Sequence, residues 1–354
     1  MDLFLNNFHA FKKKEYIMYK IITCLFAVLI FFSCDNANKH LLTSDFPKKE
    51  KLQTEHVIPS TIVAPIFFVI QANYLCTYSL QKDSMIDMFS LPDLIHVKSF
   101  GVRGKGPGEF QSFPWPCKST NNDFYVRGYT PLLIRQFTVD PCVNPILVNE
   151  FVLADYESFG PMHVVQDSLL VYLSMGYQNE NKEQISIKKY NLNQKKETGK
   201  ILIPTKSKRN ASLDPNRAGG FDVNDLYIVY AYLFKKQIDI YDVHSMKLVC
   251  RLERKKNQNP SVNKNFTENI SHYQGVITGE KYFFALYNKT VQKISESEPA
   301  SQTIEVYDYE GNALVEYSFD DYINVFVLDE MNQNLYAYDI NQEDFILKYN
   351  LKKQ

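Results

Sequence analysis

Short stretches in which apolar and polar residues alternate follow one another along most of the chain, and polar turns separate them. Alternation with a period of two predicts β-strands that bury one face. No long stretch shows the i, i+3, i+4, i+7 apolar spacing of a surface helix. The 24 tyrosines and 25 phenylalanines also favour strands. The pattern predicts an all-β fold.

A repeat unit recurs six times along the chain. Each copy contains a turn, a strand of the type "LY", a loop, a strand ending in an aromatic residue plus Asp or Asn, and another turn. The predicted second strands align at Leu75, Phe124, Leu169, Leu226, Tyr282 and Leu335. Steps of 45 to 57 residues between these positions fit four short antiparallel strands, the blade of a β-propeller.

The last copy ends after its third strand, whereas the segment 55–63 precedes the first inner strand. We expect this N-terminal segment to supply the missing outer strand. Closure of this kind removes the exposed edges of an open sheet. The prediction is therefore a six-bladed β-propeller over residues 55–354 that is closed by an N-terminal strand.

The only long apolar run, Ile21 to Cys34, follows a group of lysines near the N-terminus. Its length suits the core of a signal peptide, because a membrane-spanning helix needs about 20 apolar residues. The run ends in "FFSC", which resembles the lipobox of bacterial lipoproteins, in which the cysteine carries the lipid. Met18 is an alternative start, and an ordinary secretory signal or a short membrane anchor is the alternative interpretation.

The lipobox resemblance implies a signal peptide over residues 1–34, lipidation of Cys34 and a polar tether over residues 35–54. The mature chain then has 35 basic and 38 acidic residues, a balance that gives no indication of nucleic-acid binding. Export permits disulfides. Four cysteines allow three pairings, and buried free thiols are the alternative; they are Cys76, Cys117, Cys142 and Cys250.

Four of the 13 glycines lie in "FGVRGKGPGEFQSFP", residues 100–114. The segment resembles the one that closes an NHL-type blade and, more closely, the GKGPGEF signature of the TolB-like six-bladed propeller lipoproteins of Bacteroidetes. The resemblance implies the fold and a location in the cell envelope, with the outer membrane as the expected site of anchoring. It implies no reaction and no cofactor.

We expect residues 101–113 to carry the chain from the outer strand of blade 1 to the inner strand of blade 2, with Phe110 between the blades. Glycine tolerates the positive φ that such a crossing needs. A phosphate-binding loop is excluded because proline follows Gly106, and the dinucleotide fingerprint fails because Glu109 replaces its third glycine. The functional alternative is that Arg103, Lys105 and Glu109 contact a ligand.

The crossings between blades and the loops between second and third strands emerge on one face of a propeller, which we call the long-loop face. Long loops on a rigid scaffold often carry binding sites. Basic residues gather in the loops around blade 4: Lys206, Lys208, Arg209, Arg217, Lys235, Lys236, Arg254, Lys255 and Lys256. This basic sector predicts an anionic ligand such as an acidic glycan, a lipid headgroup or an acidic protein. The alternative is that lysines only keep flexible loops soluble.

Catalytic patterns are missing from the sequence. HExxH, the nucleophile elbow GxSxG and the EF-hand loop are all absent, so we assign no catalytic residue, metal or cofactor. His163, in "GPMHVV", is expected to line the central channel, more as a packed than as a catalytic side chain. Ser84 and Ser168 match the D-[S/T]-aliphatic pattern of Bacteroidetes O-glycosylation, although Asp-Ser is also common at turns.

These patterns together predict a lipid-anchored, monomeric propeller that binds a glycan or an envelope protein without catalysis. The alternatives are a propeller lyase or hydrolase with its site in the axial channel, and a structural partner of a neighbouring complex. A converging carboxylate and histidine cluster in the channel would favour the enzyme.

Overall fold

The computed structural model describes residues 39–41, 45–59, 64–129, 132–153, 159–179, 182–205, 213–253, 262–265, 268–288, 301–339 and 345–351. Apart from Lys39, the described residues belong to one compact unit, His40–Gln354. The described residues form strands and turns without an α-helix. Consequently, none of them belongs to a helix that is long and apolar enough to span a membrane.

Twenty-four strands form six antiparallel four-stranded blades, as the repeat predicted. Blade 1 contains β4 (Phe67–Gln71), β5 (Tyr74–Tyr78), β6 (Ser84–Ser90) and β7 (His96–Val102). Blade 2 contains β8 (Trp115–Ser119), β9 (Phe124–Tyr129), β10 (Leu132–Val139) and β11 (Pro145–Val152). Blade 3 contains β12 (Phe159–Val165), β13 (Leu169–Asn179), β14 (Lys182–Asn191) and β15 (Lys196–Ile203).

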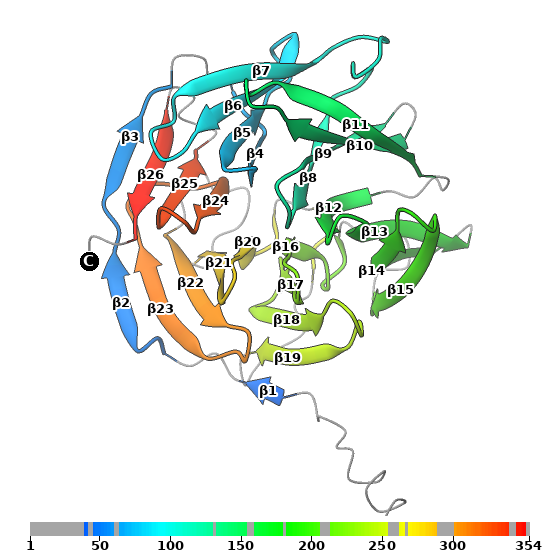
Figure 1. Ribbon diagram of the computed structural model, residues 1–354. Helices are drawn as coiled ribbons and strands as arrows, with labels where there is room; N and C mark the ends of the chain where they lie inside the picture. Colours follow the sequence, from blue (N-terminus) through cyan, green and yellow to red (C-terminus); the bar gives the residue numbers. More distant parts are fainter. Residues whose placement is uncertain are drawn as a thin grey trace, which may run out of the picture. The chain divides into compact units, whose positions relative to one another are not determined.

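The second half of the ring repeats this arrangement. Blade 4 contains β16 (Ala218–Val223), β17 (Tyr227–Tyr232), β18 (Gln237–Asp242) and β19 (Leu248–Glu253). Blade 5 contains β20 (Tyr273–Thr278), β21 (Tyr282–Asn288), β22 (Gln302–Asp308) and β23 (Ala313–Ser318). Blade 6 contains β24 (Val325–Asp329), β25 (Asn334–Tyr338), β26 (Ile346–Asn350) and β3 (Thr54–Val57). Figure 1 shows the six inner strands β4, β8, β12, β16, β20 and β24 around the centre of the ring.

The N-terminal strand β3 closes the ring, as expected. It pairs antiparallel with β26, for example Leu347 with His56, and completes the blade that the C-terminal end of the chain leaves with three strands. Blades 2 and 3 are also joined into one eight-stranded sheet, because their inner strands β8 and β12 pair in parallel. The remaining blades are separate sheets.

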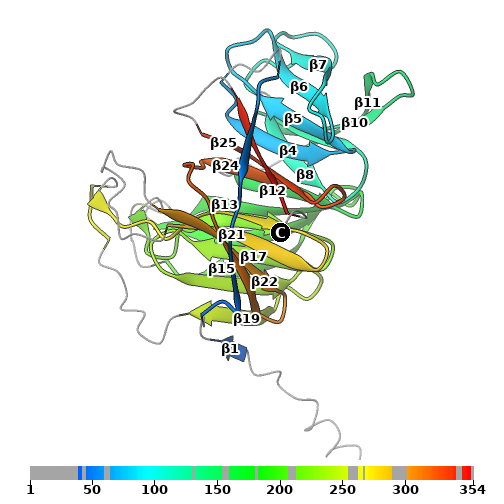
Figure 2. The ribbon, with the colours of Figure 1, turned by 90° about the vertical axis from the view of Figure 1, so that its left-hand side faces the viewer.

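Residues 45–54, which we expected to belong to a free polar tether, lie against the propeller instead. The strand β2 (Lys48–Lys51) pairs in parallel with the outer strand of blade 5, and the Leu52 N–H donates to Ser318 O at 2.8 Å. Phe46 and Leu52 are buried, and the Phe46 ring packs edge-on against Tyr307. The short strand β1 (Lys39–Leu41) adds to the edge of β19. Figure 2 faces this part of the rim and shows the blue N-terminal strands in front.

The glycine motif is the crossing between blades 1 and 2. Gly101 and Gly108 have φ of 73° and 78°, which only glycine adopts readily. Phe110 is buried among Ile86 and Phe100 of blade 1 and Phe124 of blade 2, so its expected position between blades is confirmed. The motif therefore serves the architecture at this junction.

Candidate functional site

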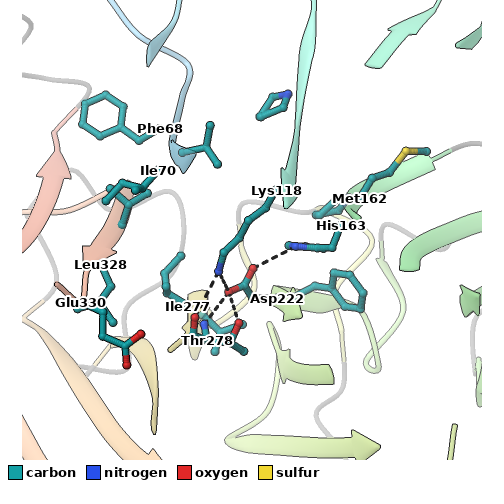
Figure 3. Close-up of a pocket in the computed structure, with 16 residues that line it drawn as sticks. Phe68, Ile70, Lys118, Met162, His163, Asp222, Ile277, Thr278, Leu328 and Glu330 are labelled. Carbon is teal, nitrogen blue, oxygen red and sulfur yellow. Dashed lines mark hydrogen bonds and ion pairs between the residues drawn. The ribbon is translucent and has the colours of Figure 1, made fainter. Parts of the chain in front are cut away.

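A cavity of about 300 Å³ lies on the axis of the ring. Each of the six inner strands, or the turn that follows it, contributes to its wall. Most of the wall is apolar, with Phe68, Ile70, Met162, Ile277 and Leu328 among its members. The polar side chains of the wall are Lys118, His163, Asp222, Thr278 and Glu330 (Figure 3).

An ion pair crosses this cavity between blades 2 and 4. Lys118 Nζ lies 2.5 Å from Asp222 Oδ2 and also donates to Thr278 O at 3.3 Å. The same Asp222 oxygen accepts from the Thr278 N–H at 2.6 Å and from Thr278 Oγ1 at 2.7 Å. Three inner strands are therefore tied together by one buried carboxylate.

His163 lies beside this ion pair because of the parallel pairing of β8 and β12, which sets His163 opposite Lys118. Its Nδ1 is 3.3 Å from Asp222 Oδ1, and its ring lies against Phe221 with centroids 5.5 Å apart. The side chain is buried, yet neither ring nitrogen has a hydrogen-bond partner among the described residues. A buried polar group without a partner is costly and calls for an explanation.

Glycines bring the strands of blades 4 and 5 close enough for the Asp222 and Thr278 contact. A Cβ at Gly219 would lie 1.8 Å from Tyr273 O, and one at Gly220 would lie 2.6 Å from the backbone of Gly275. No larger residue fits between these inner strands without moving the backbone. The pair "GG" in β16 and the single glycine in β20 thus set the geometry of the cavity wall.

Burial and charge decide the protonation of this cluster. Burial, reinforced by Lys118 and opposed by Asp222, lowers the pKa of His163 to about 4, so the imidazole is neutral at pH 7. Burial alone would raise the pKa of Asp222, but Lys118, His163 and the hydrogen bonds from Lys118 and Thr278 outweigh it and hold that pKa below its usual range. The cavity therefore contains a neutral histidine beside a balanced ion pair.

On blades 4 to 6 the wall of the cavity lies toward the face opposite the long loops. Inner strands start at the long-loop face, and Asp222 and Thr278 lie at or next to the ends of β16 and β20. Glu330 follows the end of β24, in the turn to β25, and its carboxylate accepts from the Glu280 N–H at 2.9 and 3.0 Å. We call this side, which holds the turns between first and second strands, the turn face.

The structure does not bring the three candidate residues of the glycine motif together, and their contact with a ligand stays a prediction. The Glu109 carboxylate folds back onto its own loop and accepts from the Gly106 N–H at 2.7 Å. A Cβ at Gly104 would lie 2.0 Å from Glu109 Oε2, so this glycine makes room for that carboxylate. Arg103 contacts Leu80 O at 3.4 Å, and the structure shows no contact that brings it together with Lys105.

The basic sector is described only in part. Lys236 Nζ reaches into blade 5, where it pairs with the buried Glu305 carboxylate at 2.6 Å. Lys235 Nζ lies 3.9 Å from the centroid of the Tyr232 ring, and Arg217 is half-buried. These contacts give the described members structural roles. The other members and the lipidation position lie outside the described residues: Cys34, Lys206, Lys208, Arg209, Arg254, Lys255 and Lys256.

Two further expectations concern cysteine and serine. Cys76, Cys117, Cys142 and Cys250 form no disulfide among the described residues; the alternative of buried thiols applies to three of them, whereas Cys142 is exposed. Ser84 starts β6 and Ser168 lies in the turn before β13; both are partly exposed, and their glycosylation stays a prediction. Within the described ranges, no group of three or more His, Cys, Asp or Glu residues could hold a metal ion.

The sequence interpretation anticipated His163 in the channel but missed Lys118, Asp222, Thr278 and Glu330. The sequence does contain a signal for these four residues. When the inner strands of the blades are aligned, each residue occupies one of the last two positions of its strand or the first position of the following turn. Polar residues at the ends of the innermost strands point to the axis once the blade register is known.

Comparisons with known proteins agree with this architecture. Residues 45–331 match the family described as TolB-like 6-blade propeller-like. A protein from Bacteroides fragilis NCTC 9343 that is assigned as exported has a similar structure, with a TM-score of 0.53 and 14% identity over 85% of this chain and 98% of that chain. The WD40 repeats of RRP9 give a TM-score of 0.51 and 9% identity, over 85% of this chain and all of the other.

No curated protein matches the chain. At these identities the two structures support the fold alone. The family match covers well over half of the sequence and agrees with the six blades in the structure. The chain belongs to the TolB-like 6-blade propeller-like family.

Proposed function

We propose that this protein is a lipid-anchored propeller of the bacterial envelope that binds a small molecule in its axial cavity without acting on it chemically. The observation that carries the proposal is the buried imidazole of His163, whose ring nitrogens make no hydrogen bond among the described residues, in a mostly apolar cavity. Pockets of about 300 Å³ and more, with apolar walls and a few polar groups, are typical ligand sites. The anchor rests on "FFSC", and the exported Bacteroides protein of similar fold is compatible with it.

The cavity is a better candidate than the long-loop face. Glu109 and Lys236, two of the residues expected to bind a ligand there, are bonded within the protein. A ligand group that hydrogen-bonds to His163 would, in contrast, satisfy a buried imidazole whose nitrogens make no hydrogen bond among the described residues. Burial against the apolar wall would supply most of the affinity.

A hydrolase or lyase with its site in the channel is the second hypothesis, because Asp222 and His163 are adjacent as in many acid–base pairs. Two features support binding instead. A histidine whose pKa is about 4 is a weak base at pH 7. The Asp222 carboxylate already accepts three hydrogen bonds, from Lys118 and Thr278.

The test uses the full lipidated chain in nanodiscs and 2-phenylethanol as a neutral amphipathic probe, followed by ligand-observed NMR with empty nanodiscs subtracted. We expect saturable binding that is lost when Leu328→Trp or Ile70→Trp fills the cavity. Ile95→Trp, on the exposed β6–β7 turn, is the matched control and should bind as the wild type does. Equal binding by the folded cavity-filled variants would overturn the proposal.

A further inference from the structure

The charges around the cavity define the class of molecule that it can take. Lys118 is the only basic side chain of the wall in the part of the chain that the structure describes, and Asp222 neutralises it at 2.5 Å. His163 is neutral at pH 7. Glu330 therefore leaves the wall with a net negative charge.

The turn face adds to this charge. The six turns that follow the inner strands lie nearest the axis, because the inner strands do. All six are described, and together they contain five acidic residues and one basic residue: Asp123, Asp167, Asp225, Glu280, Glu330 and Lys281. A mouth of this composition attracts cations and repels anions, an effect that salt weakens.

Glu330 connects this ring of charge with the cavity. Its carboxylate is held by the Glu280 N–H at 2.9 and 3.0 Å, and the same side chain belongs to the cavity wall beside Leu328. Figure 3 shows it at the edge of the cavity, below the apolar side chains of Leu328 and Ile70. A fixed carboxylate beside an apolar wall suits a ligand with a cationic end and an apolar body.

We propose that the axial cavity binds an amphipathic cation, whose apolar body lies against Phe68, Ile70 and Leu328 and whose ammonium-type group lies at Glu330. The inference rests on the proposed function, since it names the ligand class of the same cavity. The anionic ligand that the lysine-rich loops suggested concerns the long-loop face and stays a separate prediction. His163 forms a hydrogen bond with a polar group near the middle of the ligand, either by donating to it or by accepting from it.

Three probes with the same phenyl body and different charge test the inference: 2-phenylethylamine, 2-phenylethanol and 3-phenylpropionate. At pH 7.5 and low salt, the full chain in nanodiscs should bind the amine at least tenfold more tightly than the carboxylate. High salt should reduce this ratio at least threefold, while binding of the neutral alcohol changes little.

Substitutions show which carboxylate causes the preference for the amine over the carboxylate probe. Glu330→Gln should reduce the preference for the amine at least threefold and leave binding of 2-phenylethanol unchanged. Glu310→Gln is the control, because this exposed residue lies in the β22–β23 turn, so it changes the net charge equally but away from the axis. An equal effect of both variants would mean that Glu330 has no specific role and would overturn its assignment.

The outcomes separate the two proposals. If all three probes bind and Leu328→Trp abolishes binding, but the carboxylate binds as tightly as the amine, then the cavity is a binding site and the cation class is wrong. If binding of 2-phenylethanol does not respond to the cavity-filled variants, the proposed function itself fails.

Discussion

Lys118 of blade 2 and Asp222 of blade 4 form an ion pair of 2.5 Å in the wall of the axial cavity, although they are 104 positions apart in sequence. The carboxylate is buried, whereas about a quarter of the lysine side chain is exposed. A charge that loses its partner in such a place costs more than the pair contributes. The pair therefore fixes the relative positions of the inner strands more than it adds to the free energy of unfolding.

We predict that Asp222→Ala lowers the free energy of unfolding by about 3 kcal/mol, because Lys118 and the Thr278 N–H both lose their acceptor. Urea titration of the full chain measures the change. Adding Lys118→Met should recover part of the loss, with a coupling of about 1–3 kcal/mol between the two positions. Strictly additive effects of the two substitutions would contradict this account of the pair.

His163 should make stability depend on pH. Its pKa is about 4 in the folded protein and about 6.5 when exposed. The unfolded chain therefore binds the proton more readily than the folded protein does. The contribution of His163 to the free energy of unfolding is complete above pH 6.5 and is lost as the pH falls toward 4. Between pH 7 and pH 5 the expected loss is about 2 kcal/mol.

The matched variant is His163→Gln, which cannot take up a proton. The difference in unfolding free energy between wild type and variant, measured by urea titration at several pH values, should narrow steadily from pH 7 to pH 5. A difference that stays constant over this range would show that His163 titrates normally in the folded state.

The glycine motif should respond to substitution through two separate causes. At Gly108 a Cβ would meet no atom within 4 Å, but φ is 78°. We expect Gly108→Ala to cost about 1–2 kcal/mol through backbone strain, and Gly108→Asn to cost less because asparagine tolerates this conformation. Thermal unfolding measures both; equal losses would argue against strain as the cause.

At Gly104 the cause is contact with a neighbour. A Cβ there would collide with Glu109 Oε2 at 2.0 Å, so Gly104→Ala must displace the Glu109 carboxylate from the Gly106 N–H. The expected cost is about 1–3 kcal/mol, the penalty of an unmade hydrogen bond. In a Glu109→Ala background the same substitution should cost much less, and a full cost there would locate the clash elsewhere.

The N-terminal segment should stabilise the ring from outside. Phe46→Ala and Leu52→Ala each remove a buried side chain and should cost about 2–4 kcal/mol in urea titrations. Lys49→Ala, at an exposed position of β2, is the control and should change the stability little. If Phe46→Ala and Leu52→Ala unfold with the same free energy as Lys49→Ala, the segment docks on the propeller without adding to its stability.

The sequence predicted what depends on local periodicity. Strands β5, β9, β13, β17, β21 and β25 lie at or within one residue of the aligned positions, and closure by β3 and the place of Phe110 followed from the repeat. The cavity residues were missed because each of blades 2 to 6 supplies only one of the polar ones, and only the closed ring brings them together. Four of the six residues of β16 are buried, so alternation could not indicate that Asp222 faces the axis.

The docked N-terminal segment was missed for a different reason. Between Asp45 and Leu52 only two apolar residues occur in a polar sequence, and neither composition nor period distinguishes them from a linker. Phe46 is buried in the cluster between blades 4 and 5 and Leu52 in the cluster between blades 5 and 6, so their burial requires that these blades have formed.

A repeated charged position on the third strands is visible in sequence once the blades are aligned. Asp87, Asp239 and Glu305 each follow an isoleucine and precede an aromatic residue by two positions. All three carboxylates are buried, and each has a basic partner: Lys82, Arg251 and Lys236, respectively. The carboxylate at this position thus binds a basic side chain either from a loop between second and third strands or from an outer strand.

Asp239 offers the sharpest test of this position. It accepts two hydrogen bonds from Arg251 at 2.7 Å and others from the hydroxyls of Tyr232 and Tyr241 at 2.7 and 3.0 Å. Asp239→Ala should cost about 3–5 kcal/mol, because it leaves a guanidinium and two buried hydroxyls without their acceptor. The double variant Asp239→Leu with Arg251→Met replaces the pair by apolar groups of similar size and should recover the part of the loss that comes from the unpaired guanidinium. Urea titration of the three proteins decides the matter: a double variant no more stable than Asp239→Ala would mean that the hydrogen bonds of this carboxylate, and not the balance of its charge, hold the blade together.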